Sequence, residues 1–166
     1  MDTHARGAHP DTSRPRADRR TGRPGDDELR LLADAVMSLS DDMHEALLPV
    51  WEPLTGLQVL FLRIIARYDR VTRHDLMTRC RTSGAAVTPG LASMVHRRYV
   101  VETPDGAETV LTLGPEGSAM LTRMERARVE FVRRALEAHD GRLDDDVDRT
   151  ATVLQSLRDV TATATA

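Results

Sequence analysis

Apolar and polar residues alternate along most of the chain with the period of an α-helix. The pattern predicts long amphipathic helices over 26–48, 115–138 and about 143–160, and shorter helices beginning at Thr55, Thr72 and Ser83. After the third short helix, the runs YVVET and ETVLTL flank the turn signal Pro104-Asp105-Gly106, which predicts a β-hairpin. The expected fold class is therefore mainly α with one small β-hairpin.

Two of the short helices begin with a capping box. Thr55 is followed three residues later by Gln58, and Thr72 by Asp75, so each threonine hydroxyl accepts a backbone N–H in the first turn. The first short helix is expected to bury Leu57, Leu60, Phe61, Ile64, Ile65 and Tyr68, which share one helical face. The second short helix is expected to bury Leu76.

Prolines affect two of the predicted helices. Pro49 and Pro53 are expected to end the first long helix, because proline has no N–H to donate and clashes with the preceding turn. The expected buried face of the third short helix consists of Val87, Leu91, Met94 and Val95. The pair Pro89-Gly90 interrupts this helix, so either it kinks there or it begins at Thr88 with Pro89 in its first position.

The ordered set of residues between 54 and 117 resembles the MarR family of bacterial winged-helix transcription regulators. The residues that carry the resemblance are Leu54, Thr55, Gln58, Leu62, Thr72, Asp75, Leu76, Ser83, Val87, Thr88, Leu91, Tyr99, Val100, Leu111, Thr112, Leu113 and Gly117. The resemblance implies a winged helix-turn-helix over 54–113 with dimerisation helices over 26–48 and 115–160, in one domain over 26–160. It also implies a homodimer that binds double-stranded DNA at a pseudo-palindromic operator, most often as a ligand-responsive repressor.

The composition excludes several classes of site. All 23 basic residues are arginine, so the chain has neither a Walker A phosphate loop nor a lysine Schiff base. The single cysteine, Cys80, excludes an internal disulfide and a multi-cysteine zinc site, and we expect it to be a packed structural thiol. With no catalytic motif present, we expect no enzyme, no cofactor and no metal. No apolar run has the length of a transmembrane helix or a signal core, so we expect a soluble, cytoplasmic protein without a membrane partner.

Positive charge is concentrated where the winged helix is expected. Residues 55–100 hold eight arginines and two aspartates, a net charge of +6, whereas residues 26–54 carry −7. This segregation favours contact with a DNA backbone although the whole chain carries −3. Residues 1–25 are rich in arginine and nearly devoid of apolar residues, which predicts a disordered arm, and residues 161–166 are expected to be a disordered tail. The arm is either a solubilising tail or a contact for DNA phosphates.

The predicted DNA-binding residues flank the third short helix or face outward from it. They are Arg73, Arg79, Arg81, Ser83, Ala85, Thr88, Ser93, His96, Arg97 and Arg98. The arginines are expected to contact phosphates, while hydroxyl groups and contacts to thymine methyl groups provide a modest base readout. The predicted wing departs from the family because Glu102, Asp105 and Glu108 replace its usual basic residue. We expect this acidic tip to repel phosphate.

The resemblance also implies a ligand site where the dimerisation helices meet the winged helix. The residues predicted near it are Met37, Met43, His44, Leu47, Trp51, Leu57 and Met120. The expected ligand is a small hydrophobic or aromatic molecule, although these residues equally have the spacing of ordinary core packing. Two functions therefore stay open: a ligand-responsive regulator, and a MarR-like fold that has lost operator binding and binds, or acts on, a hydrophobic metabolite.

Overall fold

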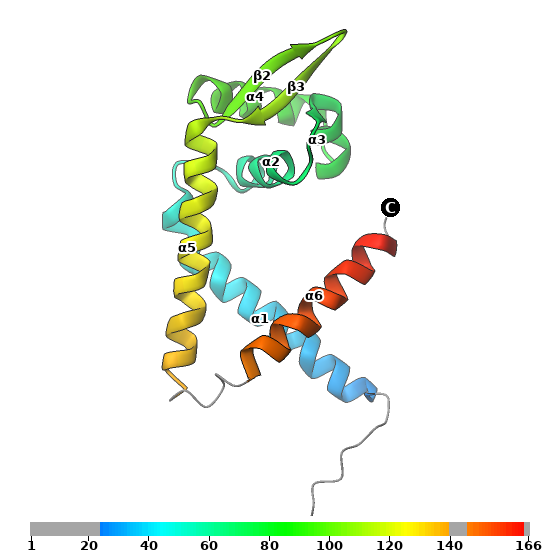
Figure 1. Cartoon of the computed structure of the whole chain (residues 1–166), viewed down its shortest axis with the longest axis vertical. Coiled ribbons are helices and arrows are strands. Elements are labelled where there is room, and N and C mark those ends of the chain that lie inside the picture. The colour runs from blue at the N-terminus through cyan, green and yellow to red at the C-terminus, as the bar shows by residue number, and fades with distance from the viewer. Residues whose placement is uncertain (1–23, 140–145, 165–166) are drawn as a thin grey trace, which may run out of the picture. The chain divides into compact units, whose positions relative to one another are not determined.

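The computed structural model describes residues 24–139 and 146–164, with side chains up to residue 160. The elements follow in the order α1 (Asp26–Trp51), α2 (Gly56–Arg67), β1 (Val71–Thr72), α3 (Arg73–Cys80), α4 (Gly84–His96), β2 (Val100–Asp105), β3 (Glu108–Leu113), α5 (Pro115–Glu137) and α6 (Val147–Ala164). The predicted fold class, mainly α with a β-hairpin wing, is confirmed (Figure 1). The chain divides into residues 1–37 and 38–166, and the winged helix lies wholly within the second unit. Residues 1–23 of the predicted arm lie outside the described residues, whereas the tail predicted over 161–166 overlaps the end of α6, which runs to Ala164.

Both predicted capping boxes are present. In α2 the Thr55 backbone N–H donates to the Gln58 side chain at 3.0 Å, and the Gln58 N–H donates back to the Thr55 hydroxyl at 3.3 Å. In α3, Thr72 and Asp75 make the equivalent pair of bonds at 2.8 and 3.2 Å. Because each box satisfies N–H groups that a helix start leaves without partners, the two caps set where α2 and α3 begin.

The sheet has three antiparallel strands in the order β1-β3-β2. The hairpin pairs Val100 with Leu113 at its base and Asp105 with Glu108 at its tip, where Gly106 takes a φ of 64°. Strand β1, which is only two residues long, pairs with the middle of β3 and was not predicted from the sequence. This short strand fixes the segment between α2 and α3 against the wing.

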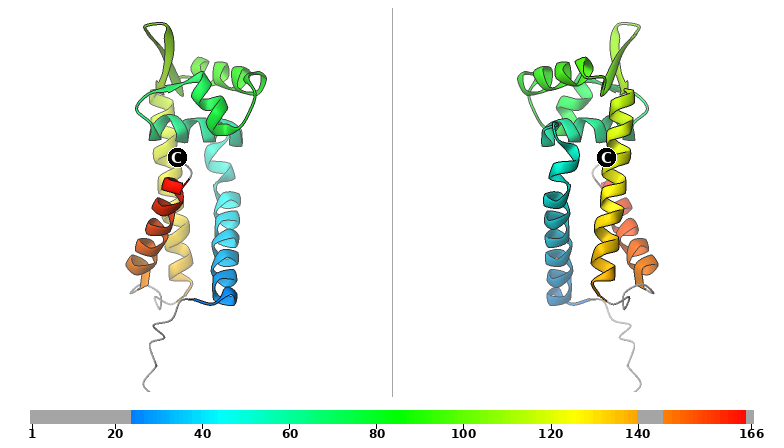
Figure 2. Two further views of the ribbon diagram at one scale, coloured as in Figure 1. Left: turned by 90° about the vertical axis from the view of Figure 1, so that its right-hand side faces the viewer. Right: turned by 90° about the vertical axis from the view of Figure 1, so that its left-hand side faces the viewer.

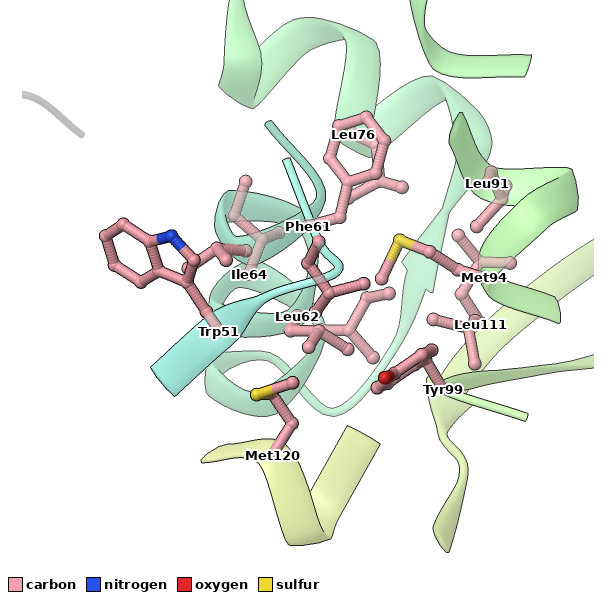
Figure 3. Packing of buried hydrophobic residues seen from close by; sticks show 14 of the residues in the cluster. Trp51, Phe61, Leu62, Ile64, Leu76, Leu91, Met94, Tyr99, Leu111 and Met120 are labelled. Carbon is pink, nitrogen blue, oxygen red and sulfur yellow. The ribbon is translucent and has the colours of Figure 1, made fainter. Parts of the chain in front are cut away.

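The core lies where α2, α3 and α4 meet the sheet, as Figure 3 shows around Phe61 and Leu62. Phe61, Ile64 and Ile65 are buried as predicted, but Leu60 and Tyr68 are 39 % and 37 % exposed, so their predicted burial is wrong. Val59 and Leu62 are buried instead. The buried face of α2 is rotated from the predicted one because the helix is covered from more than one side: it contacts α3, α4, α5 and β3.

Two prolines lie inside helices. The prediction that Pro49 ends the first helix is wrong, because α1 continues through it to Trp51. Likewise α4 begins at Gly84 and passes through Pro89, so the alternative start at Thr88 is wrong. In each helix, buried apolar residues lie on both sides of the proline or directly beside it. Their packing offsets the backbone hydrogen bond that each proline removes.

The start of α5 packs directly against the chain between α4 and β2. The Gly114 N–H donates to the Tyr99 carbonyl at 2.9 Å, and the Glu116 N–H donates to the Arg98 carbonyl at 3.3 Å. A Cβ atom on Gly114 would lie 2.1 Å from the Arg98 carbonyl oxygen, and one on Gly117 would lie 2.2 Å from the Tyr99 carbonyl oxygen. Only glycine permits this approach, which anchors the long helix α5 to the wing.

Helices α1, α5 and α6 expose apolar side chains. The exposed residues include Leu29, Leu31, Leu32, Val36, Val129, Val132, Val153, Leu157 and Val160. All the side chains described in α6 are exposed. Within residues 24–139 and 146–164, no single helix combines the length and apolar content needed to cross a membrane, and α1 and α2 meet that requirement only together, as a bent pair.

Candidate nucleic-acid interface

Helix α4 presents two chemically different faces. Val87, Leu91 and Met94 point into the core. The outward residues predicted to meet DNA are Ser83, Ala85, Thr88 and His96, which are exposed, and Ser93, which is half-buried. A face of small and hydroxyl-bearing side chains leaves the helix backbone open to close approach by a partner. The geometry of the helix therefore suits the groove contacts predicted from the sequence.

Gln58 fixes α4 to the helix beneath it. Its side-chain N–H donates to the Gly90 carbonyl at 3.2 Å, while its oxygen completes the α2 capping box. Gln58 is 7 % exposed, and among the residues that the structure describes it is the buried polar side chain. A single amide thus orients α4 on α2, directly behind the outward face.

Three of the predicted phosphate-contacting arginines donate hydrogen bonds to other side chains among the described residues. Arg73 lies 2.7 Å from the Glu102 carboxylate, and Arg98 lies 3.4 Å from that of Glu116. Arg97 donates to the Tyr99 hydroxyl at 3.2 Å and lies over the tyrosine ring at 4.9 Å. These guanidinium groups are directed by local contacts, which the sequence alone does not reveal.

The hairpin projects beyond α4 (Figure 2). Its carboxylates pair with Arg70, just before β1, and with Arg73, at the start of α3. Arg70 pairs with Asp105 and lies 3.1 Å from Glu108, so it bridges the two sides of the tip. The hydrogen bond to Glu108 and the charge of Asp105 raise the pKa of Arg70. Arg70 and Arg73 together offset two of the three wing acids. The wing is therefore less repulsive to phosphate than its sequence predicts. Its acids also pair with Arg70 and Arg73, which contribute to the net charge of +6 counted over residues 55–100.

The remaining arginines of the predicted interface lie toward α2. Arg79 lies 3.7 Å over the ring of Tyr68, and Arg81 takes a left-handed conformation with φ 49° at the C-cap of α3. Both line a surface hollow of about 510 Å³ that also contains Arg63 and Arg67. Arg63 and Arg67 were not predicted as site residues. Their spacing of four residues places both on one face of α2, and this spacing could have indicated that they act together.

The residues predicted near a ligand site occupy different environments. Leu47, Trp51 and Met120 are buried in the core, and Figure 3 shows Trp51 and Met120 against the same cluster. Met43 and Leu57 pack partly buried against that cluster, whereas Met37 is 60 % exposed. His44 lies on the surface with its ring 4.8 Å from the ring of Trp51. Leu47 also lines a hollow of about 510 Å³ between α1 and α5, beside Val50 and Phe131.

Cys80 packs partly buried against the core. Burial raises the pKa of its thiol, so the reactive thiolate is disfavoured at neutral pH. Both observations fit the structural thiol predicted from the sequence.

Comparison by sequence and comparison by fold give different results. No protein-family model matches the chain, and no curated protein matches it in sequence. In contrast, 148 chains of solved structures match its fold.

Three of these structures illustrate the likeness. A MarR family protein from Bacillus stearothermophilus has a TM-score of 0.65 and 17 % identity, covering 81 % of this chain and 92 % of its own. The multiple antibiotic-resistance repressor (MarR) of Listeria monocytogenes has a TM-score of 0.62 and 14 % identity, over 82 % and 95 %. The apo form of wild-type MarR from E. coli has a TM-score of 0.54 and 19 % identity, over 79 % and 94 %. The chain therefore has the winged-helix fold of the MarR-family transcription regulators.

Proposed function

We propose that the protein is a DNA-binding transcription regulator that places the outward face of α4 in the major groove. The observation that carries this proposal is the exposed, small-residue face of α4, held on α2 by Gln58 and presented by a winged helix. Solved structures with this fold include proteins named as transcriptional regulators and as a repressor. An α-helix fits the major groove when its outer side chains are small or polar.

The proposed contacts divide into base readout and phosphate binding. Ser83, Thr88 and Ser93 supply hydroxyl groups, and Ala85 supplies a methyl group for thymine. Arg81 is the flanking arginine nearest the start of α4 in the chain. Arg73 and Arg98 must exchange their carboxylate partners for a phosphate. Arg79 and Arg97 must leave the tyrosine rings on which they lie. This exchange lowers the net gain from each phosphate contact.

Fluorescence anisotropy with a duplex from the protein's own promoter region tests the proposal. At about 0.15 M salt we expect the promoter duplex to bind about a thousandfold more tightly than a scrambled duplex. A Thr88→Ala variant should lose part of this preference, whereas an Arg81→Gln variant should weaken both duplexes alike and flatten the salt dependence by about one contact. Equal affinity for both duplexes would contradict the proposal.

We also propose that the regulator is a homodimer on a pseudo-palindromic operator. The exposed leucines and valines of α1, α5 and α6 would be covered by the same helices of a second copy, and a two-fold pair of α4 helices would meet two half-sites. Light scattering at micromolar concentration should give twice the monomer mass. Replacing Val153 and Leu157 by serine should shift the mass toward the monomer, and a monomeric wild type would contradict the assembly.

Ligand-responsive repression is part of the same proposal. A small aromatic or hydrophobic molecule would enter beside Met37, Met43, His44 and Leu57, and would reach Leu47, Trp51 and Met120 only by displacing core packing. Trp51 is the sole tryptophan, so its fluorescence reports binding directly. We expect a small aromatic ligand to quench it saturably and to release DNA. Quenching without release would contradict the regulatory role.

The wing favours a second candidate function. Because Arg70 and Arg73 are engaged by wing acids, the hairpin offers no unpaired arginine to a minor groove. A protein of this fold that has lost operator binding, and instead binds or acts on a hydrophobic metabolite, would bind DNA weakly and without sequence preference. The same anisotropy titration separates the two candidates, since binding of the second kind disappears at physiological salt.

A further inference from the structure

A surface hollow between the C-terminal ends of α2 and α3 gathers four guanidinium groups. Arg63 and Arg67 enter it from α2, and Arg79 and Arg81 from α3 and its C-cap. Its volume is about 510 Å³, which lies within the range of small-molecule sites. Leu60 and Ile64 provide an apolar floor.

None of these four arginines forms an ion pair with a carboxylate in the described parts of the chain. Elsewhere in the winged helix, Arg70, Arg73 and Arg98 are all paired. Helix C-termini favour cations, and this accounts for Arg67 and Arg79, which lie in the last turns of α2 and α3. The two helix ends together supply about one negative charge. The Asp75 carboxylate also interacts with Arg79, but the hollow keeps a net positive charge.

A second group of arginines lies between α2 and α5. A second hollow, of about 350 Å³, shares Arg63 and Arg67 and adds Arg128 and Glu125. Burial lowers the pKa of Arg128, the nearby charge of Arg63 lowers it further, and Glu125 raises it, so Arg128 and Arg63 are close enough to repel each other. Such crowding is unfavourable in the free protein, and a bound anion would relieve it.

We propose that the hollow lined by Arg63, Arg67, Arg79 and Arg81 binds a small phosphate compound carrying two or more negative charges. Guanidinium groups bind phosphate oxygens through two parallel N–H donors, and Thr78 adds a hydroxyl donor at the edge. The apolar floor of Leu60 and Ile64 accommodates an organic group attached to the phosphate. This site does not depend on the proposed operator binding.

The hollow is separate from the outward face of α4. Phe61, Leu62 and Ile65 of α2 point into the core, on which the inner face of α4 also packs. Leu60, Arg63 and Arg67 lie on the solvent side of α2. An anion bound there therefore leaves the proposed base contacts of α4 free. It would compete with DNA only for Arg79 and Arg81, which line the hollow and are also proposed phosphate contacts.

Isothermal titration calorimetry of the full chain with pyrophosphate and with ATP, at about 0.1 M salt, tests the proposal. We expect saturable binding of both, with one site per protomer, and no binding of uncharged adenosine. Arg63→Gln and Arg67→Gln should each weaken ATP binding about tenfold, because each removes a charged hydrogen-bond donor. Arg126→Gln, which changes net charge equally on an exposed part of α5, should leave it unchanged.

Three results would overturn the site. One is the absence of saturable binding by folded wild type, and another is an equal loss in Arg126→Gln. The third is a combined result: Arg63→Gln loses DNA affinity as much as ATP affinity, and any DNA duplex displaces ATP. The hollow would then be a contact for the DNA backbone. Thermal melting followed by circular dichroism identifies a variant that fails to fold. If Arg63→Gln or Arg67→Gln fails to fold, the other variant still tests the site.

Discussion

Thr72 and Asp75 illustrate how a pair of side chains determines where a helix begins. Asp75 accepts hydrogen bonds from the Thr72 backbone N–H and from the Thr72 hydroxyl, both at 2.8 Å. The backbone bond, and then the hydroxyl bond, hold the pKa of Asp75 below its usual value. The ionised carboxylate is therefore the form that stabilises the start of α3, directly after the β1 strand.

This shift predicts a pH-dependent stability at the scale of one residue. Because the folded-state pKa of Asp75 is lower than the value of about 3.9 in an unfolded chain, its contribution is present above about pH 4. The contribution is lost as the pH falls through the folded-state pKa. We expect Asp75→Asn to lower the urea midpoint at pH 7, with the difference from wild type shrinking on acidification. Asp41→Asn, at an exposed position of α1, is the control, and a pH-independent difference would contradict the cause assigned here.

At the scale of elements, the junction between the wing and α5 depends on two glycines. A side chain on Gly117 would meet the backbone carbonyl of Tyr99 at 2.2 Å, and backbone cannot move aside as a flexible side chain can. We expect Gly117→Ala to destabilise the protein by about 2 kcal/mol or more in chemical denaturation. Gly56→Ala, where an added Cβ meets nothing within 4 Å, should be neutral or slightly stabilising. Equal stability of the two variants would show that α5 shifts freely against the wing.

Short-range sequence patterns predicted where helices begin more reliably than which of their residues are buried. The Thr55 and Thr72 caps depend on residues three positions apart, so the sequence contains all the information that they need. Leu60 and Tyr68 were expected to be buried, but helical periodicity does not reveal how many neighbours cover a helix. Pro49 was expected to end α1 because proline removes a helical hydrogen bond. The sequence does not show that Leu47 and Trp51 are buried on either side of it and compensate for that loss.

At the scale of the whole molecule, charge is arranged by contacts between segments far apart in sequence. The arginine count over residues 55–100 gives a net charge of +6, but it does not predict that Arg70 pairs across the wing with Asp105 and Glu108. Nor did it predict that Arg63 and Arg67 would face the same hollow as Arg79. Such pairings require the register of the sheet and the packing of α2 on α3, which no local pattern specifies.

The wing pairing leads to a prediction for DNA binding, which rests on the proposed function. Asp105→Arg removes one partner of Arg70 and adds a second cation at the hairpin tip. We expect tighter binding to the promoter duplex by about 1 kcal/mol at low salt, with a smaller gain as salt rises. Glu137→Arg makes the same change in net charge at the far end of α5 and should have little effect. Affinity unchanged by Asp105→Arg would mean that the wing does not approach DNA.

The exposed surface of α6 has a consequence for how the protein responds to dilution. An 18-residue helix whose described side chains are all exposed has little beyond its own backbone hydrogen bonds to keep it folded, and such helices are marginal in water. The amide hydrogens of α6 should then exchange with deuterium far faster than those of α2, whose side chains form the core. If a second copy covers α6, its exchange should slow as protein concentration rises, while that of α2 stays constant. Deuterium uptake would then report the assembly of the protein residue by residue.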